Sequence, residues 1–281
     1  MKLFRVLMAA ALIVTLLAGC GSGGEPADSG DTVLATTYPM YYLTSRLLEG
    51  AEQISVELMI SDSVSCLHDY TLTTAQMKKI DRADVIVMNG GGLEDFMASA
   101  LEGVSRERII VAEEAADDPH GWLNPQRYQA ACVTVSNALI RQYPEANQVL
   151  TDNLRVLTAE LEGLQAELEG ELSGLQSREL ITFHDGFAPF AEAFDLTILA
   201  AIEEEEGAEA SAGELKEICD LIEKHRLPAI FVEKNGSTNA AEIISRETGA
   251  QVFTLNTMMD GQTDYFTAMR ENVQAVKEAL S

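Results

Sequence analysis

Basic side chains are scarce in this 281-residue chain, which has 19 Lys and Arg residues against 45 Asp and Glu residues. The formal net charge is −26 at pH 7, and no stretch of the sequence gathers basic residues into a patch. Because nucleic-acid backbones carry dense negative charge, this composition excludes a general nucleic-acid-binding protein.

Long apolar runs are also scarce. One short apolar run covers residues 6–17, and no repeated runs of membrane-spanning length follow it. This excludes a polytopic membrane protein. The hydrophobic share of 47% excludes low-complexity disorder and fits one or two globular domains with a sizeable core.

The N-terminal segment has the pattern of an export signal. Lys2 and Arg5 precede the apolar run, and the following Leu17-Ala18-Gly19-Cys20 resembles the bacterial lipobox. We therefore expect residues 1–19 to be a signal peptide, Cys20 to carry the lipid, and residues 20–31 to form a flexible tether. The protein is then exported and anchored by lipid at the outer face of the bacterial cytoplasmic membrane, or periplasmic.

Three further cysteines are present, an odd number for an oxidising compartment. At most one disulfide can form among Cys66, Cys132 and Cys219, and the pattern does not choose the pair. Cys132 lies in an apolar helical pattern and is expected in the core. A Cys66–Cys219 bridge is one option, and Cys66 is also a weak metal-ligand candidate.

Short β-branched or apolar runs alternate with amphipathic stretches of helical length. The predicted strands are 32–36, 54–60, 85–89, 109–112, 179–183, 197–202, 229–233 and 251–255. The predicted helices are 40–48, 74–83, 125–143, 212–226, 240–248 and 265–280. This alternation predicts an α/β fold with parallel sheets covered by helices, in an N-terminal lobe over 32–144 and a C-terminal lobe over 177–281.

Between the lobes, residues 145–176 are predicted to form one long helix. Leucines recur there at steps of three and four, which places them on one helical face: Leu150, Leu154, Leu157, Leu161, Leu164, Leu168, Leu172 and Leu175. A coiled-coil dimer is the competing interpretation. We favour a single helix packed along both lobes, because only about four heptads are present.

The chain has four histidines, and three of them follow a predicted strand or open a helix. His68, His120 and His184 would meet in one cleft if the two lobes face each other, because ligands of α/β sheets bind at the carboxyl ends of strands. Three neutral imidazoles suit Zn²⁺ or other late first-row divalent ions. Asp69 and Asp185 directly follow two of these histidines and are candidate carboxylates behind the rings. His225, at a helix end, is expected to be solvated.

Several sequence blocks resemble the zinc/manganese substrate-binding lipoproteins of ABC transporters. The likeness covers nearly all of residues 31–281, in the order of that family, and is carried by Tyr38-Pro39-Met40-Tyr41-Tyr42, Leu67-His68-Asp69-Tyr70, Asn89-Gly90-Gly91-Gly92-Leu93-Glu94, Asp118-Pro119-His120-Gly121-Trp122-Leu123-Asn124-Pro125, Thr182-Phe183-His184-Asp185-Gly186-Phe187 and Phe231-Val232-Glu233. The resemblance implies two α/β lobes joined by one long helix, with a metal ion between them. It also implies that His68, His120 and His184 are ligands.

The resemblance leaves the fourth ligand open. Many relatives have Asp where this chain has Asn256, and zinc-binding relatives with Asn there use an acidic residue a few positions later. Asp260 is the expected ligand, with the Asn256 oxygen or a water as alternatives. Histidine rather than carboxylate at the third position favours Zn²⁺ as the transported ligand over Mn²⁺.

The expected function is therefore a monomeric receptor, not an enzyme, that captures Zn²⁺ and delivers it to an ABC permease for import. The alternatives are a manganese receptor of the same family, a surface adhesin, or an exported zinc hydrolase with Glu233 or Glu94 as general base. The sequence contains neither a His-Glu-x-x-His pair nor a nucleophile elbow, so no catalytic residues are assigned.

Overall fold

The computed structural model describes residues 30–61, 67, 70–203, 210–234, 236–259 and 261–281. Residues 31–281 form one compact unit, apart from the N-terminal segment. The predicted signal peptide, Cys20 and the tether up to residue 29 lie outside the described residues, as do Cys66, His68, Asp69 and Asp260. None of the helices formed by the described residues is both long and apolar enough to cross a membrane.

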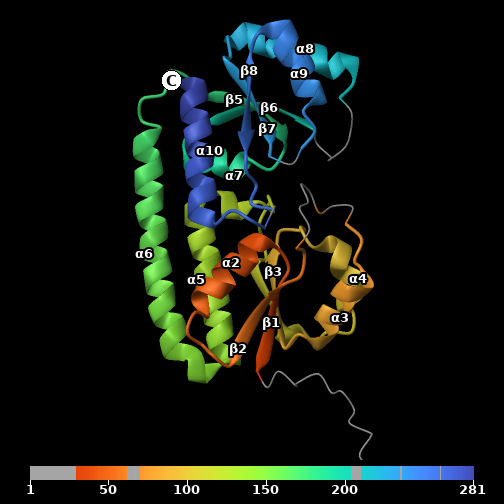
Figure 1. Ribbon diagram of the computed structural model, residues 1–281, viewed down its shortest axis with the longest axis vertical. Coiled ribbons are helices and arrows are strands. Elements are labelled where there is room, and N and C mark those ends of the chain that lie inside the picture. The colour runs from red at the N-terminus through yellow and green to blue at the C-terminus, as the bar shows by residue number, and fades with distance from the viewer. Residues whose placement is uncertain (1–29, 62–66, 68–69, 204–209, 235, 260) are drawn as a thin grey trace, which may run out of the picture. The chain divides into compact units, whose positions relative to one another are not determined.

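Two four-stranded sheets, all of whose strands are paired in parallel, form the framework (Figure 1). The first sheet has the order β2-β1-β3-β4 and is formed by β1 (Asp31–Ala35), β2 (Ile54–Leu58), β3 (Val85–Gly90) and β4 (Ile109–Glu113). The second has the order β6-β5-β7-β8 and is formed by β5 (Glu179–His184), β6 (Thr197–Glu203), β7 (Ala229–Glu233) and β8 (Gln251–Leu255). The predicted fold class is confirmed.

Helices connect the strands, as parallel pairing requires. They are α2 (Tyr38–Leu47), α3 (Thr74–Arg82), α4 (Ala98–Leu101), α5 (Pro125–Gln142), α6 (Asn147–Glu171), α7 (Ala188–Ala193), α8 (Ala212–His225), α9 (Asn239–Thr248) and α10 (Tyr265–Leu280). Helices α3 and α8 both begin with a capping box. The N-cap hydroxyl of Thr73 or Ser211 accepts from the backbone N–H of the third helical residue, whose side chain accepts from the N-cap backbone N–H.

Helix α6 is the predicted connecting helix, and its leucine face is buried within the chain. Leu150, Leu157, Leu161, Leu164 and Leu168 are each at most 2% exposed, and α6 packs against α2, α5 and α10. Figure 1 shows α6 and α10 side by side, and Arg270 of α10 donates to both carboxylate oxygens of Glu167 at 2.7 Å. The leucine pattern is therefore accounted for by packing inside the chain.

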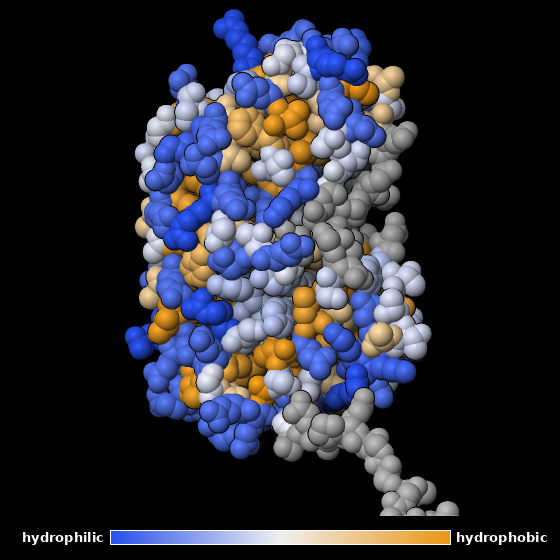
Figure 2. Space-filling view, viewed as in Figure 1, coloured by the Kyte–Doolittle hydropathy of each residue, from blue (hydrophilic) through white to orange (hydrophobic). Residues whose placement is uncertain are grey.

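One apolar core extends through both sheets and the helices between them. It includes Val33 and Leu161 as well as Phe231 and Tyr265. A smaller cluster lies between the second sheet and α8 and α9, around Ile181, Ile222 and Ile244. On the face shown in Figure 2, polar side chains cover most of the surface and apolar ones are scattered between them. The larger apolar core joins the two lobes, because it contains residues of both sheets.

Candidate metal centre

His120 lies in the connection between β4 and α5. The chain turns directly after it through a short 3-10 helix, Gly121–Leu123, and Asn124 then caps α5 by accepting from the backbone N–H groups of Gln126 and Arg127. His120 is only 6% exposed. Asp118 Oδ1 accepts from the His120 backbone N–H at 2.8 Å and lies 2.9 Å from the ring Nδ1. This carboxylate favours a proton on Nδ1, which leaves the lone pair of the neutral ring on Nε2.

His184 is the last residue of β5, at the carboxyl edge of the second sheet. Its Nδ1 lies 3.4 Å from Oε1 of Glu233, the last residue of β7. Thr182 is the register partner of Phe231, so His184 and Glu233, two residues further along, lie at the same level on neighbouring strands. Both side chains are largely buried, at 12% and 7% exposure.

The two histidines meet through their Nε2 atoms, which lie 3.1 Å apart. The rings are nearly perpendicular, at 87°, with centroids 4.9 Å apart. Gly186 permits this approach, because a Cβ there would lie 2.5 Å from His184 Nε2 and 3.0 Å from His120 Cδ2. The structure therefore brings together two imidazole nitrogens from opposite lobes, each with a carboxylate behind its other ring nitrogen.

The carboxylate behind His184 is not Asp185, the one suggested by the sequence, and Asp69 lies outside the described residues. Asp185 is exposed, and its side chain makes no hydrogen bond or ion pair with a described residue. Asp118 and Glu233 occupy the position next to Nδ1 instead. The sequence did not assign this position to either, and Glu233 was considered only as a general base. Each nevertheless carried a signal: Asp118 lies two residues before His120, and Glu233 ends a predicted strand.

Of the two candidates for the fourth ligand, only Asn256 is described. It directly follows β8 and is 4% exposed. Its Oδ1 accepts from the Met258 backbone N–H at 2.8 Å, and Asn272 binds its backbone N–H and carbonyl at 2.7 and 2.9 Å. Its buried Nδ2 has no partner among the described residues. The side chain thus lies at the carboxyl edge of the second sheet, and one lone pair of its Oδ1 already accepts a hydrogen bond.

Within the described ranges, no three His, Cys, Asp or Glu side chains come together as a metal site. His68 and Asp260, the other expected ligands, are outside those ranges. His225 is not part of the centre, since its Nδ1 lies 3.0 Å from Oε2 of Glu179, at the amino-terminal end of β5. Cys132 is buried and Cys219 partly buried, and they do not pair with each other.

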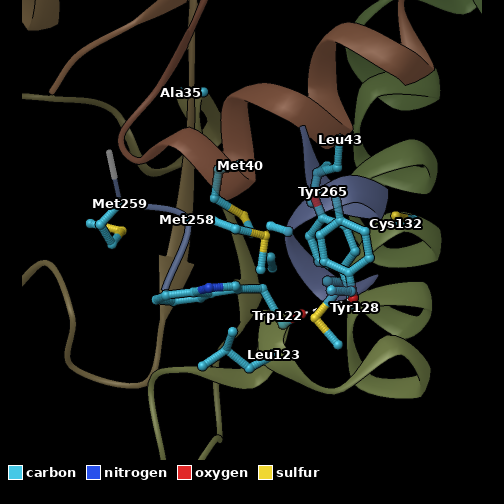
Figure 3. Packing of buried hydrophobic residues seen from close by; sticks show 14 of the residues in the cluster. Ala35, Met40, Leu43, Trp122, Leu123, Tyr128, Cys132, Met258, Met259 and Tyr265 are labelled. Carbon is cyan, nitrogen blue, oxygen red and sulfur yellow. Dashed lines mark hydrogen bonds between the residues drawn. The ribbon is translucent and has the colours of Figure 1, made fainter. Parts of the chain in front are cut away.

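Trp122, two residues after His120, lies in the buried cluster that also contains Met258 and Tyr265 of the C-terminal lobe (Figure 3). Its ring centroid lies 5.3 Å from that of His120, and its Nε1 donates to the Thr257 carbonyl at 2.9 Å. Tyr265 of α10 donates to the Trp122 carbonyl at 2.9 Å and stacks on Tyr128 with centroids 4.2 Å apart. The turn that carries His120 is therefore fixed by residues far away in the sequence.

Two carboxylates near the centre have shifted pKa values. Burial by itself raises the pKa of Asp118, but its hydrogen bonds with His120 and the nearby Arg127 charge hold that pKa below the usual range. Burial raises the pKa of Glu94, even though Thr36 Oγ1, Asn89 N and Gly90 N donate to it at 2.6, 2.7 and 3.0 Å. Glu94 therefore holds the loop after β3 through these three hydrogen bonds.

Nitrogen donors supported by carboxylates are the ligand pattern of late first-row divalent cations. A family model described as ZnuA, zinc-uptake complex component A, periplasmic, matches residues 33–279. The fold and this match define the class as a metal-binding substrate-binding protein of an ABC transporter. Within that class, the chain belongs to the ZnuA family.

Individual relatives agree. The chain is 24% identical to the high-affinity zinc uptake system protein ZnuA of Bacillus subtilis, over 94% of each chain. It is 23% identical to the zinc-binding lipoprotein AdcA of Streptococcus pneumoniae, where the match covers 97% of this chain and 60% of the longer AdcA. Among solved structures, a ZnuA crystal structure matches with a TM-score of 0.80 and 26% identity, covering 90% of this chain and all of the other. The laminin-binding protein Lbp of Streptococcus pyogenes matches with a TM-score of 0.78 and 26% identity, with the same coverage.

Proposed function

We propose that this protein is an extracytoplasmic receptor that captures Zn²⁺ between its two lobes and hands it to an ABC permease for import. The metal is cargo and undergoes no reaction on the protein. The family and its zinc-uptake relatives support this proposal. The local observation that carries it is the pair of facing imidazoles.

The His120 and His184 Nε2 atoms have the spacing of two ligands on one zinc ion. Zinc–nitrogen bonds of about 2.0–2.1 Å at a tetrahedral angle put two ligand nitrogens about 3.3 Å apart. The observed separation of 3.1 Å is close to that value. With the proton of each neutral ring on Nδ1, beside its carboxylate, the two Nε2 lone pairs face each other, an arrangement that a shared cation stabilises. With a metal, both lone pairs are used.

His68 and Asp260 complete the proposed tetrahedral set, with the Asn256 oxygen as the alternative to Asp260. A set of three nitrogens and one oxygen, closed to a catalytic water, suits a carrier better than a hydrolase. The same nitrogen donors favour Zn²⁺ over Mn²⁺, which prefers oxygen ligands. Cys20 would carry the lipid that holds this receptor, as a monomer, beside its permease.

Surface adhesion is the second candidate, because a solved structure of similar fold is that of a laminin-binding protein. A hydrolase has less support. Glu94 already accepts three hydrogen bonds, and Glu233 lies beside His184 Nδ1, the ring nitrogen that does not face His120.

A chelator-competition titration of a soluble form starting at Gly21 tests the proposal, with Zn²⁺ and Mn²⁺ compared. We expect one zinc ion to bind tightly, Mn²⁺ to bind far more weakly, and His68→Ala, His120→Ala and His184→Ala each to weaken zinc binding strongly. His225→Ala is the matched control, because His225 pairs with Glu179 at the opposite edge of the sheet. Absence of tight binding of either ion would reject the receptor. Laminin binding that survives loss of the three histidines would then favour the adhesin.

A further inference from the structure

Arg127, in the first turn of α5, joins the end of β4 to the start of the loop that carries His120. Its Nη2 donates to Glu113 Oε2 at 2.8 Å and to the Asp118 carbonyl at 3.0 Å. The Arg127 and Glu113 side chains are partly buried, at 28% and 14% exposure. The ion pair is therefore less screened than one on the open surface.

Glu113, the last residue of β4, lies directly against the residue that follows His120. A Cβ on Gly121 would lie 2.3 Å from each oxygen of the Glu113 carboxylate. The carboxylate therefore touches the backbone of the turn while it accepts from Arg127. Glu113, at the end of β4, thus contacts Gly121 after His120 and is linked through Arg127 to Asp118 before it.

A separate contact holds the middle of this loop. Asn89, near the end of β3, donates from Nδ2 to the Pro119 carbonyl at 2.6 Å. The Arg127 contact differs because it holds Asp118, whose carboxylate binds both the ring and the backbone N–H of His120. A shift of Asp118 would therefore turn the imidazole directly.

We propose that Arg127 and Glu113 are positioning residues for metal capture: they fix the loop 118–121 so that His120 Nε2 faces His184. Neither residue contacts the ion. This inference rests on the proposed function, because it takes His120 to be a metal ligand. Outer partners of this kind commonly change metal affinity by about 10–100-fold, and we expect the lower end because Arg127 acts through Asp118.

The experiment compares Arg127→Ala and Glu113→Gln with the unchanged protein, by Zn²⁺ titration against a chelator and by the visible absorption of bound Co²⁺. Arg106→Ala is the matched control, because Arg106 forms an exposed ion pair with Glu114 next to the same strand. Arg127→Ala is also combined with His120→Ala. Melting of the metal-free proteins reports whether each variant is folded.

We expect both substitutions to weaken Zn²⁺ binding about tenfold and to change the Co²⁺ spectrum, with melting close to that of the unchanged protein. Arg106→Ala should change neither the Zn²⁺ affinity nor the Co²⁺ spectrum. Arg127→Ala should not lower the Zn²⁺ affinity further in the His120→Ala protein. Wild-type affinity and spectrum in Arg127→Ala would overturn the assignment, as would an equal loss in the His120→Ala background. If Arg127→Ala does not fold, Glu113→Gln decides by the same readings. Failure of the unchanged protein to bind either ion would reject the proposed function itself.

Discussion

The ring of Trp122 lies 5.3 Å, centroid to centroid, from the ring of His120. Trp122 is the only tryptophan in the chain, so its fluorescence reports on the candidate metal centre alone. We expect Zn²⁺ to change the intensity or wavelength of this emission with one-to-one saturation, because binding at His120 Nε2 changes the charge beside the indole.

The same titration on His184→Ala should lose this response, since the ion then lacks a ligand from the opposite lobe. His225→Ala should retain it. An emission that stays constant while zinc binding is detected independently would show that the ion binds elsewhere.

Glu94 offers a test of stability rather than metal binding. Glu94→Ala removes a buried acceptor from the backbone N–H groups of Asn89 and Gly90, and it leaves the Thr36 hydroxyl with only the longer 3.3 Å contact to the Val87 carbonyl. We expect the free energy of unfolding to fall by about 2–4 kcal/mol, measured by chemical denaturation. Glu102→Ala, at an exposed position, is the control. Unchanged stability of Glu94→Ala would contradict the assigned structural role.

Asp264, which is not a candidate ligand, is expected to make the stability of the fold depend on pH. It caps α10, its Oδ1 accepting from the Thr267 backbone N–H at 3.1 Å. Burial favours a higher pKa, but the hydrogen bonds with Thr267 outweigh it and lower the pKa of Asp264. A lowered acid pKa stabilises the fold above the unfolded-state value and loses this effect as pH falls through the folded-state value.

Asp264→Ala should therefore cost about 0.5–2 kcal/mol at pH 7, with the difference from the unchanged protein shrinking below about pH 4. Denaturant unfolding at several pH values measures this. Asp264→Asn retains the cap but does not titrate, so it should lose less at pH 7. A pH-independent difference for Asp264→Ala would rule out the carboxylate as its source.

Patterns local in the sequence predicted the fold well. The β-branched runs gave all eight described strands, and the leucine spacing gave α6, although that helix ends at Glu171, before the predicted residue 176. Helix α7 was not predicted, because its six residues are less than two turns and show no clear period. Helix α2 begins at Tyr38 rather than Met40, because Pro39 is tolerated in a first turn.

The candidate site was less accessible from sequence. The position of His184 at a strand end indicated which edge of the sheet it occupies, and this is a local property. The contact of Glu233 with His184 depends on the register of two strands that are distant in sequence. The contact of Asp118 with His120 depends on the conformation of a loop held by Asn89 and Arg127. Neither the strand register nor the loop conformation produces a periodic pattern in the sequence.

Gly186 tests whether the close approach of the two rings matters. An alanine Cβ would lie 2.5 Å from His184 Cδ2 and Nε2 and 3.0 Å from His120 Cδ2, closer than van der Waals contact allows. The His184 ring can turn away from this contact at little cost to the fold, but it then no longer presents Nε2 beside that of His120. We expect Gly186→Ala to weaken Zn²⁺ binding by at least about tenfold in a chelator competition, with near-normal unfolding.

Gly163→Ala is the matched glycine control. Gly163 lies in α6 with no atom within 4 Å of an added Cβ, so alanine there should stabilise the helix by about 0.5–1 kcal/mol and leave zinc affinity unchanged. A Gly186→Ala protein with normal zinc affinity would mean that the two imidazoles tolerate separation. That result would remove the main geometric support for a shared ion, whereas a loss confined to Gly186→Ala would tie affinity to the contact between His120 and His184.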